Sequence, residues 1–379
     1  MKAQNKIVLS IGSNQGKRKL YIQEAIAQIN QEVGTVISVS KLYESPSWGF
    51  ESDPFYNAAV LLHTTYSASK VLREILKIEK QLGRVREGNK GYNSRTIDID
   101  IVSFNNEVID TESLQIPHPQ MQNRLFVLLP LQDVKADFIH PALKQNLEEL
   151  LRSCMDQGAC KVIDSLENPL KINQISQYNF IAIEGNIGAG KTTLAHKIGD
   201  DFNAKKILER FADNPFLPKF YKDQNRYAFP LEISFLADRY QQISDDLAQL
   251  DLFKDFIIAD YHIFKSLIFA KVTVTEDEFR LYRKLFEIIY KEIPKPDLYI
   301  YLYQNTGRLL QNIKKRGRSY EQEISPAYLG KINEGYLDFI KTHPEINVLV
   351  LDVSERDFVK NQSDYIYILQ EIEKALSKN

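Results

Sequence analysis

The sequence predicts two domains of different class: an α+β domain, then an α/β domain built on a parallel sheet. A chain of 379 residues is long for one hydrophobic core. Strand-like and helical runs mix without strict order in the first half, whereas the second half opens as strand, glycine-rich loop and helix. The intervening stretch Asp164–Gln177 is polar and aperiodic. We therefore expect domains at 1–165 and 178–379, joined by a linker at 166–177.

The elements of the first half follow from apolar periodicity. The opening run 6–12 ends in glycine and is predicted to be a strand, as are the runs 35–43, 55–64 and 96–104. Apolar residues at helical spacing predict helices over 20–30 and 68–82. Glu79 borders the buried face of the second of these helices.

The second half carries short apolar runs separated by helical segments. The run 180–185 stops at a glycine, and further runs occupy 206–208, 256–259, 298–303 and 348–351. Strands that alternate with helices in this way favour a parallel sheet covered on both faces.

Composition limits the classes of partner. The chain is 44% hydrophobic and 26% charged, with a net charge of −2, so no global basic field would recruit nucleic acid or anionic lipid. The two cysteines, Cys154 and Cys160, are too few for a disulfide framework or a zinc site. The amino-terminal apolar run is too short for a signal peptide, and no run approaches the ~18 apolar residues of a membrane span. These features indicate a cytoplasmic protein that binds small phosphorylated ligands.

A phosphate-binding loop follows the strand 180–185. Residues 185–192 match G-x-x-x-x-G-K-[ST] between a strand and a helix, the context that this motif requires. Backbone N–H groups would curl round a phosphate, Lys191 would reach the β- and γ-phosphates, and the Thr192 hydroxyl would hold Mg²⁺. The alternative is a glycine-rich turn with an incidental lysine. The predicted phosphate-binding residues are Gly185, Asn186, Ile187, Gly188, Ala189, Gly190, Lys191, Thr192 and Thr193.

The segments after this loop resemble the deoxynucleoside kinase family, in particular its bacterial deoxyadenosine/deoxyguanosine kinase branch. The matching stretches are 208–217 (LERFADNPFL), 229–240 (FPLEISFLADRY), 259–265 (ADYHIFK) and 315–318 (KRGR), in the family's order. The resemblance implies an α/β P-loop kinase with a parallel sheet. It also implies ATP as donor and a purine deoxynucleoside as acceptor, deoxyadenosine first.

The same resemblance assigns roles to individual residues. Glu209 would be the general base for the sugar 5′-hydroxyl, and Arg316 and Arg318 would form a lid over the transferring phosphate. Asp260 ends a strand where an acid can hold Mg²⁺ through water. Tyr261 stands where many family members have arginine, and Glu232 where much of the family reads the base with glutamine. The nucleoside-binding set is Glu232, Phe235, Arg239 and Asp260, although packing would equally explain Phe235 and Arg239.

In the first half, Asp98 and Asp100 lie at i and i+2 of a predicted strand. Period-2 geometry directs both carboxylates to one face, where a pair of acids can hold divalent ions. In isolation such a pair is often only solvated.

The surroundings of this pair resemble hydroxymethyl-dihydropterin pyrophosphokinase, a folate-pathway enzyme. The matching stretches are 11–14 (IGSN), 43–46 (YESP), 55–60 (FYNAAV), Glu79, 83–86 (GRVR), 95–100 (RTIDID), 117–119 (PHP) and 123–126 (NRLF). The resemblance implies a ferredoxin-like mixed sheet with helices. It also implies transfer of pyrophosphate from ATP to a hydroxymethyl-pterin, with two Mg²⁺ held by Asp98 and Asp100.

The implied site has a phosphate end and a pterin end. Arg84, Arg95, His118 and Arg124 would face the phosphates, with Glu79 in the same group. Phe55 and Phe126 would sandwich the pterin, with Ser45, Pro46 and Asn57 at its edge; ordinary core packing is the alternative for the two aromatics. The loop 86–94 departs from the family, because an expected tryptophan near Gly91 or Tyr92 is missing and Ser94 replaces a proline.

Together these patterns predict a bifunctional kinase that uses ATP and Mg²⁺ at two separate sites. The alternative is that one half is catalytically silent and acts as a regulatory or nucleotide-sensing module. Nucleic acid and membranes are not expected as partners. The sequence leaves the oligomeric state open, but P-loop kinases of this type commonly dimerise, so the kinase half is the candidate for a homodimer contact.

Overall fold

The computed structural model describes residues 4–49, 51–84, 94–170, 175–210, 214–248, 251, 253–291 and 293–376. The chain divides into two compact units, Met1–Lys171 with Lys360–Gln370, and Ile172–Val359 with Glu371–Asn379. At the end of the first unit, the Asn168 amide donates to the Ile37 carbonyl (3.3 Å) and Leu170 is buried. The expected linker 166–177 stays a prediction, because residues 171–174 lie outside the described part.

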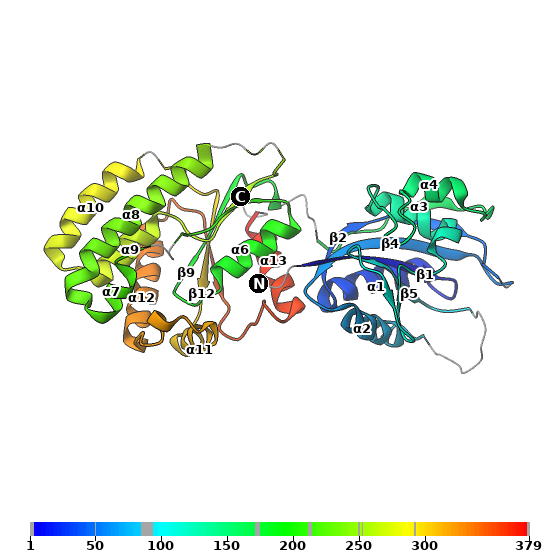
Figure 1. The fold of residues 1–379 in the computed structure, drawn as a ribbon, viewed down its shortest axis with the longest axis horizontal. Coiled ribbons are helices and arrows are strands. Elements are labelled where there is room, and N and C mark those ends of the chain that lie inside the picture. Colours follow the sequence, from blue (N-terminus) through cyan, green and yellow to red (C-terminus); the bar gives the residue numbers. More distant parts are fainter. Residues whose placement is uncertain are drawn as a thin grey trace. The chain divides into compact units, whose positions relative to one another are not determined.

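The first unit is a sheet with helices on both faces (Figure 1). Its strands lie in the order β5 (Asp98–Phe104), β1 (Asn5–Ser13), β4 (Phe55–Thr64), β3 (Leu42–Ser45) and β8 (Lys161–Asp164), and β2 (Thr35–Val39) also pairs with β4. The predicted α+β class is confirmed. Each pairing among the described strands is antiparallel, so the sheet is more uniform than the mixed sheet expected.

One predicted strand, 35–43, is two strands in the structure. The break falls at Ser40, whose hydroxyl accepts the Ala59 N–H (2.9 Å) and donates to the Lys41 carbonyl (2.7 Å). A side chain that binds backbone groups in this way competes with the regular ladder.

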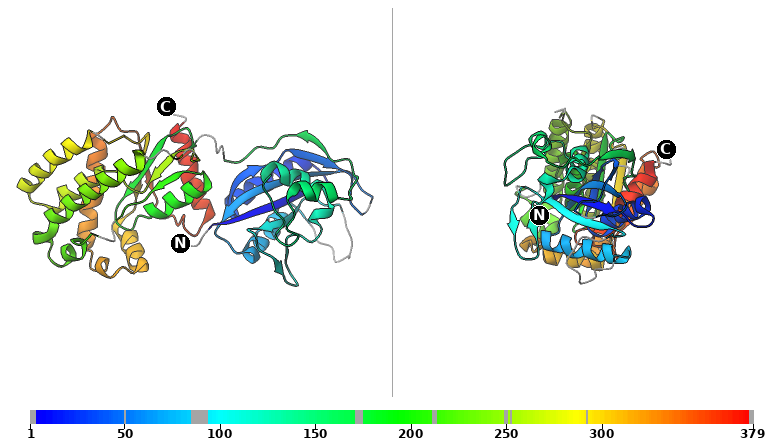
Figure 2. Two further views of the ribbon diagram at one scale, coloured as in Figure 1. Left: turned by 45° about the horizontal axis from the view of Figure 1, so that its top comes forward. Right: turned by 90° about the vertical axis from the view of Figure 1, so that its right-hand side faces the viewer.

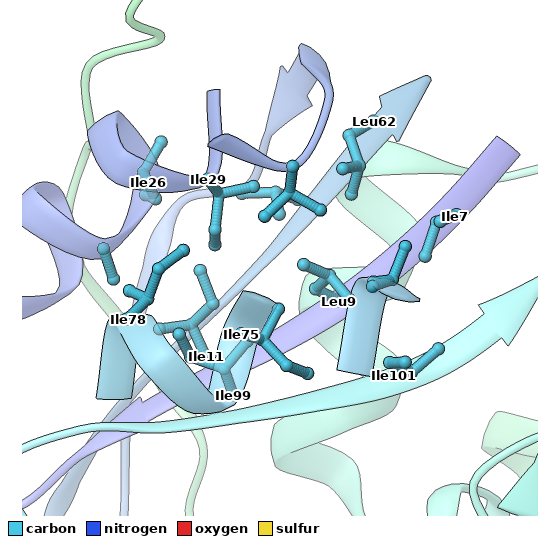
Figure 3. Close-up of a cluster of buried hydrophobic side chains, with 14 of the residues drawn as sticks. Ile7, Leu9, Ile11, Ile26, Ile29, Leu62, Ile75, Ile78, Ile99 and Ile101 are labelled. Carbon is cyan, nitrogen blue, oxygen red and sulfur yellow. The ribbon is translucent and has the colours of Figure 1, made fainter. Parts of the chain in front are cut away.

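Strand alternation builds the core of this unit. Ile7, Leu9 and Ile11 of β1 point to one face and pack with helices α1 (Arg18–Glu32) and α2 (Ala68–Gln81), as Figure 3 shows. Val8 points to the other face, toward α3 (Leu125–Val134) and α4 (Leu147–Ser153). The remaining elements are β6 (Ile109–Asp110), β7 (Gln115–Ile116) and a 3₁₀ turn, Met121–Asn123.

The second unit is built on a parallel sheet, as predicted. The order is β10 (Lys205–Ile207), β11 (Ile257–Ala259), β9 (Phe180–Gly185), β12 (Leu298–Tyr303) and β13 (Val348–Asp352), and each pairing is parallel. The carboxyl ends of all these strands therefore meet at one edge, which is where parallel sheets place their ligands.

Helices cover both faces of this sheet. The core on one face joins β9, β11 and β12 to α8 (Gln224–Ala248), α9 (Phe264–Thr273), α10 (Glu276–Tyr290) and α12 (Pro326–Thr342), which lie on the same side of the sheet in two views (Figures 1 and 2). Helix α6 (Lys191–Asp201) lies on the opposite face (Figure 1). The other elements are α7 (Leu217–Lys222), α11 (Thr306–Arg316) and a 3₁₀ turn, Ser319–Glu321. Helix α13 (Gln362–Leu376) contains the division at Gln370 between the two units.

Each helix among the described residues is too short or too polar to cross a bilayer.

Candidate active sites

A pocket opens on the α3 face of the first sheet. Nearly all of the predicted pterin and phosphate residues line it, together with Trp48 and Gly12, which sequence reasoning did not assign. The predicted residues that line the pocket are Ser45, Pro46, Phe55, Asn57, Arg95, Asp98, Asp100, His118, Arg124 and Phe126.

Strand register explains why these residues meet. Gly12 of β1 pairs with Asn57 on one neighbouring strand and with Asp98 on the other. Because alternate residues of β5 face opposite sides, Asp98 and Asp100 line the pocket while Ile99 and Ile101 enter the hydrophobic core. A Cβ atom at Gly12 would lie in van der Waals contact with Asn57 Oδ1 (3.5 Å) and with the Phe55 ring (3.7 Å), so this position borders the predicted pterin residues.

The acidic end of the pocket is held by two arginines. Arg84 bridges Glu79 and Asp98, and Arg95 Nη1 lies 2.9 Å from Asp98 Oδ2. Burial, together with the neighbouring Asp98 carboxylate, raises the pKa of Asp100. Two acids forced together in this way are a favourable place for a cation.

The donor set fits magnesium. Among the described residues no group of three or more His, Cys, Asp and Glu side chains converges on one point, so the protein itself offers a pair of carboxylates here. Mg²⁺ prefers such hard oxygen donors, and it usually binds through one or two carboxylates plus substrate phosphates.

Glu79 lies behind the pocket and does not line it. Its side chain is 1% exposed, and Oε1 accepts the Ile99 N–H at 2.9 Å and the Arg84 guanidinium. Arg84 is likewise absent from the lining residues. Glu79 therefore anchors β5 and Arg84 and would reach a bound phosphate only through them.

The aromatic end of the pocket holds Phe55, Phe126 and Trp48. Trp48 meets Phe126 edge to face, with ring centroids 6.3 Å apart. Arg95 and Arg124 lie 5.6 and 5.7 Å from the ring centres of Phe55 and Phe126. Trp48 is the single tryptophan of the chain and follows the Ser45-Pro46 motif closely, a signal by which it could have been found.

A second hollow adjoins the first and shares Asp100 and His118 with it. Leu72, Thr111 and Leu114 are among its other lining residues. Burial, followed by the nearby Arg124, lowers the pKa of His118, so its imidazole is neutral near pH 7. In the loop 86–94, residues 86–93 lie outside the described part; Ser94 Oγ accepts the Asn14 amide at 3.1 Å.

In the second unit the predicted phosphate-binding loop joins β9 to α6. Gly188 and Gly190 have φ of +85° and +90°, a conformation that glycine adopts without strain. The Lys191 ammonium donates to the carbonyls of Gly185 and Asn186, both at 2.9 Å, so the loop is curled round its own lysine. Burial, followed by the nearby Lys265, lowers the pKa of Lys191.

Only part of the loop faces the adjoining pocket. Ile187, Gly188, Lys191 and Thr192 line it, whereas Gly185, Asn186, Ala189, Gly190 and Thr193 are not among the lining residues. Asn186 instead ties the loop to α12, since its Nδ2 donates to the Leu329 carbonyl (2.7 Å) and to Asn333 Oδ1 (2.8 Å).

Asp260 links this loop to the end of β10. One of its carboxylate oxygens accepts the Thr192 hydroxyl, and the other accepts the Glu209 N–H at 2.7 Å. Asp260 also lines the pocket. The arrangement puts the two predicted magnesium residues side by side, at the carboxyl edge of the sheet.

Glu209 is a carboxylate, 12% exposed, between two cations. Lys265 Nζ lies 2.6 Å from Oε2, and Arg239 Nη2 lies 2.7 Å from Oε1. Burial alone would raise the pKa of Glu209, but Lys265 and Arg239 outweigh burial and hold it well below the usual range. Sequence reasoning did not assign Lys265. Its position within the apolar run 263–270 was the available signal, because a buried lysine needs a partner.

Beyond Glu209 the pocket becomes aromatic. Glu232, Phe235 and Arg239 lie at i, i+3 and i+7 of α8, so they share one helix face, and all three line the pocket. The Arg239 guanidinium lies 4.7 Å from the Phe235 ring centre. Aromatic side chains from other elements complete this end of the pocket: Phe220, Tyr221, Phe269 and Tyr328.

The two predicted lid arginines meet on one acid. Arg316 and Arg318 both bind the buried Glu321, with Arg318 Nη1 at 3.1 Å from Oε1. All three residues line the pocket. Glu321 was not expected from the sequence, because its role depends on the turn that brings it back to α11.

Comparisons with known proteins match the two units separately. The family model for deoxynucleoside kinase matches residues 181–377, and that for 7,8-dihydro-6-hydroxymethylpterin-pyrophosphokinase matches residues 8–136. Deoxyguanosine kinase of Bacillus subtilis is 39% identical over 201 residues, which are 52% of this chain and 97% of that protein.

Two further relatives extend this pattern. A 2-amino-4-hydroxy-6-hydroxymethyldihydropteridine pyrophosphokinase of Porphyromonas gingivalis is 40% identical over 138 residues, which are 36% of this chain and 93% of that protein. A deoxyadenosine/deoxycytidine kinase of Bacillus subtilis is 29% identical over 220 residues, covering 55% and 99% of the two chains.

Proposed function

Because the chain belongs to the hydroxymethylpterin pyrophosphokinase family through residues 8–136 and to the deoxynucleoside kinase family through residues 181–377, we propose how the residues of each half carry its reaction. The protein is a fusion of two transferases.

In the first half, the pterin ring lies between Phe55 and Phe126, with Asn57 at its polar edge. The observation that supports this best is that the aromatic pair and the Asp98–Asp100 pair line one pocket. ATP occupies the adjoining hollow, which shares Asp100 and His118. The hydroxymethyl oxygen then forms a bond to the β-phosphorus, the bond from the β-phosphorus to the AMP oxygen breaks, AMP leaves, and the hydroxyl proton is released to solvent. Arg95 and Arg124 compensate the charge on the phosphates.

In the second half, Glu209 orients the 5′-hydroxyl of the nucleoside. Its ion pairs with Lys265 and Arg239, which fix the carboxylate in place, support this role. A carboxylate with so low a pKa is a weak base, but the loose transition state of phosphoryl transfer requires little proton removal before bond cleavage. Lys191 leaves the loop carbonyls to hold the β- and γ-phosphates. Arg316 and Arg318 turn from Glu321 to the transferring phosphoryl group.

Magnesium is part of the proposal at both sites. Asp98 and Asp100 would hold it in the first half, and Thr192, with Asp260 through water, in the second. Bound there, Mg²⁺ would neutralise the phosphate oxygens and hold the attacking and leaving groups in line.

The kinase half forms a homodimer in this proposal. Leu281, Leu285 and Ile288 lie at i, i+4 and i+7 of α10 and are 52%, 38% and 67% exposed, an apolar stripe that a second copy would cover. Leu285→Lys should shift the sedimentation of the full chain from dimer to monomer, and a monomeric wild type would contradict the proposal. We also assign the protein to the cytoplasm, since both reactions consume ATP and both cysteines are free.

A two-substrate assay tests the proposal and its rival, in which one half is a silent regulatory module. AMP is measured with 6-hydroxymethyl-dihydropterin, and ADP with the four deoxynucleosides. Lys191→Ala should remove nucleoside phosphorylation and leave AMP release unchanged, because each half has its own phosphate site. A folded wild type that is inactive on either substrate would support the rival. A severalfold change of AMP release in Lys191→Ala would show that the halves are coupled.

A further inference from the structure

Glu232 lines the aromatic end of the kinase pocket and carries an unsatisfied oxygen. Its side chain is 2% exposed, and Oε2 is buried without a hydrogen-bond partner in the described part of the chain. Buried polar atoms are almost always hydrogen-bonded, so an exception in a pocket is a place for a ligand group. The neighbouring aromatic side chains, among them Phe235 and Tyr328, suit a flat base.

The other oxygen of Glu232 contacts a shared hydroxyl. Thr273 Oγ1 lies 3.1 Å from Glu232 Oε1 and 2.9 Å from the Phe269 carbonyl oxygen. The single hydrogen of this hydroxyl is shared between the two acceptors. Oε1 is therefore an acceptor in both protonation states, and the proton of the neutral acid would reside on Oε2, the oxygen without a partner.

These two forms match different purines. A carboxylate only accepts, and guanine presents two adjacent donors, N1–H and N2–H₂, along its Watson–Crick edge. A neutral carboxylic acid offers one donor and one acceptor, which match the N1 acceptor and the N6–H₂ donor of adenine. Each mismatched pair would leave a buried polar group unpaired, which is how binding sites reject analogues strongly.

We propose that Glu232 selects the purine through its protonation state, pairing with deoxyguanosine as a carboxylate and with deoxyadenosine as the neutral acid. The inference rests on the proposed placement of the nucleoside in this pocket. At neutral and alkaline pH it reverses the order expected from the sequence, which put deoxyadenosine first.

The charged and titratable groups around Glu232 come from every neighbouring element. Arg239 lies on the same helix, Glu209 at the end of β10, Lys265 on α9 and Tyr282 on α10. Tyr221 on α7 and Tyr328 on α12 complete the set. Burial raises the pKa of Glu232 to about 7 against the lowering effect of Arg239, so both forms are populated near neutral pH.

A competition assay on the full chain tests the inference. Deoxyguanosine and deoxyadenosine are phosphorylated in one reaction, and the product ratio gives the ratio of their kcat/KM values. Ionisations of the enzyme or of ATP that affect both reactions equally cancel in this ratio. For the wild type we expect deoxyguanosine to be favoured by about 100-fold at pH 8.5, and this preference to fall at least about tenfold by pH 6.

Deoxyinosine is a probe that needs no mutation, because it lacks only the N2 amino group of guanine. We expect its kcat/KM to be about tenfold or more below that of deoxyguanosine at pH 8.5, the loss typical of a hydrogen bond to a charged group. Equal values for the two nucleosides would overturn the inference.

Glu232→Gln presents one donor and one acceptor at every pH. We expect it to lower the deoxyguanosine preference by about 100-fold and to abolish its pH dependence. Asp238→Asn, on the exposed face of the same helix, is the matched control and should leave the ratio unchanged. A ratio in Glu232→Gln within twofold of the wild type would also overturn the inference. Failure of the folded wild type to phosphorylate any deoxynucleoside would instead contradict the proposed function.

Discussion

The Lys265 ammonium lies 2.6 Å from Glu209 Oε2 in the interior of the kinase half. Lys265 is on α9 and Glu209 follows β10, so the contact joins two segments far apart in the sequence. Arg239 holds the other carboxylate oxygen at 2.7 Å. Glu209 is therefore ionised and fixed in place before substrate arrives.

Lys265→Met should lower kcat for deoxyguanosine about 100-fold, the usual loss when one electrostatic partner of a phosphoryl-transfer site is removed. The substitution keeps most of the side-chain volume but leaves Glu209 with Arg239 alone. A thermal unfolding transition like that of the wild type shows that the kinase half of the variant is folded, and AMP release from the pterin reaction should not change. The control is Lys271→Met, at an exposed position of the same helix. Nucleoside activity of Lys265→Met within threefold of wild type would contradict the assignment.

Asp98→Ala or Asp100→Ala should abolish pterin pyrophosphorylation, because a single carboxylate cannot complete the magnesium site. AMP release is the measurement, and chelation of Mg²⁺ should have the same effect on the wild type. Asp137→Asn changes an acid whose side chain is 85% exposed and should have no effect. Near wild-type AMP release in either alanine variant would show that the pair is not the metal site.

Phe126→Ala should weaken pterin binding about 30-fold or more, from the loss of ring stacking and of buried apolar area. Trp48 reports this directly, because it is the single tryptophan of the chain and contacts Phe126. Fluorescence titration with the pterin gives the affinity, and the Trp48 fluorescence of each protein without pterin is the reference for its own titration. Phe253→Ala alters a phenylalanine that is 86% exposed and should leave the titration unchanged. An unchanged affinity in Phe126→Ala would place the pterin elsewhere.

The free energy of unfolding of the kinase half should fall as pH rises from about 4.5 to 7, because Glu232 loses its proton over this range. Its folded pKa, about 7, is above the unfolded value near 4.5, so the folded state holds a proton that the unfolded state releases. The contribution is complete below the unfolded pKa and is lost by about pH 8, with a total of about 3 kcal/mol. The Tm of wild type minus that of Glu232→Gln should therefore decrease across this range. Parallel curves for the two proteins would show that Glu232 does not titrate there.

The features predicted correctly from the sequence are those whose determinants are contiguous. The glycine-rich loop 185–192 was predicted between a strand and a helix, and the structure places it between β9 and α6. The shared face of Asp98 and Asp100 follows from the period of a strand. The break at Ser40 was missed because it depends on a hydroxyl that binds a neighbouring strand.

The tertiary structure decided which distant side chains act together. Glu79 was expected among the phosphate-binding residues, but the packing of α2 behind β5 buries it against Ile99 and Arg84. Lys265 and Glu321 acquire partners only when helices and turns meet, and no local period predicts such contacts. The sequence by itself determined the two domain types, the phosphate loop and the acidic pair, because backbone geometry sets these over a few residues. Packing between distant elements decided the ion pairs of Glu209 and the environment of Glu232, because burial and the neighbouring charges set the protonation of a carboxylate.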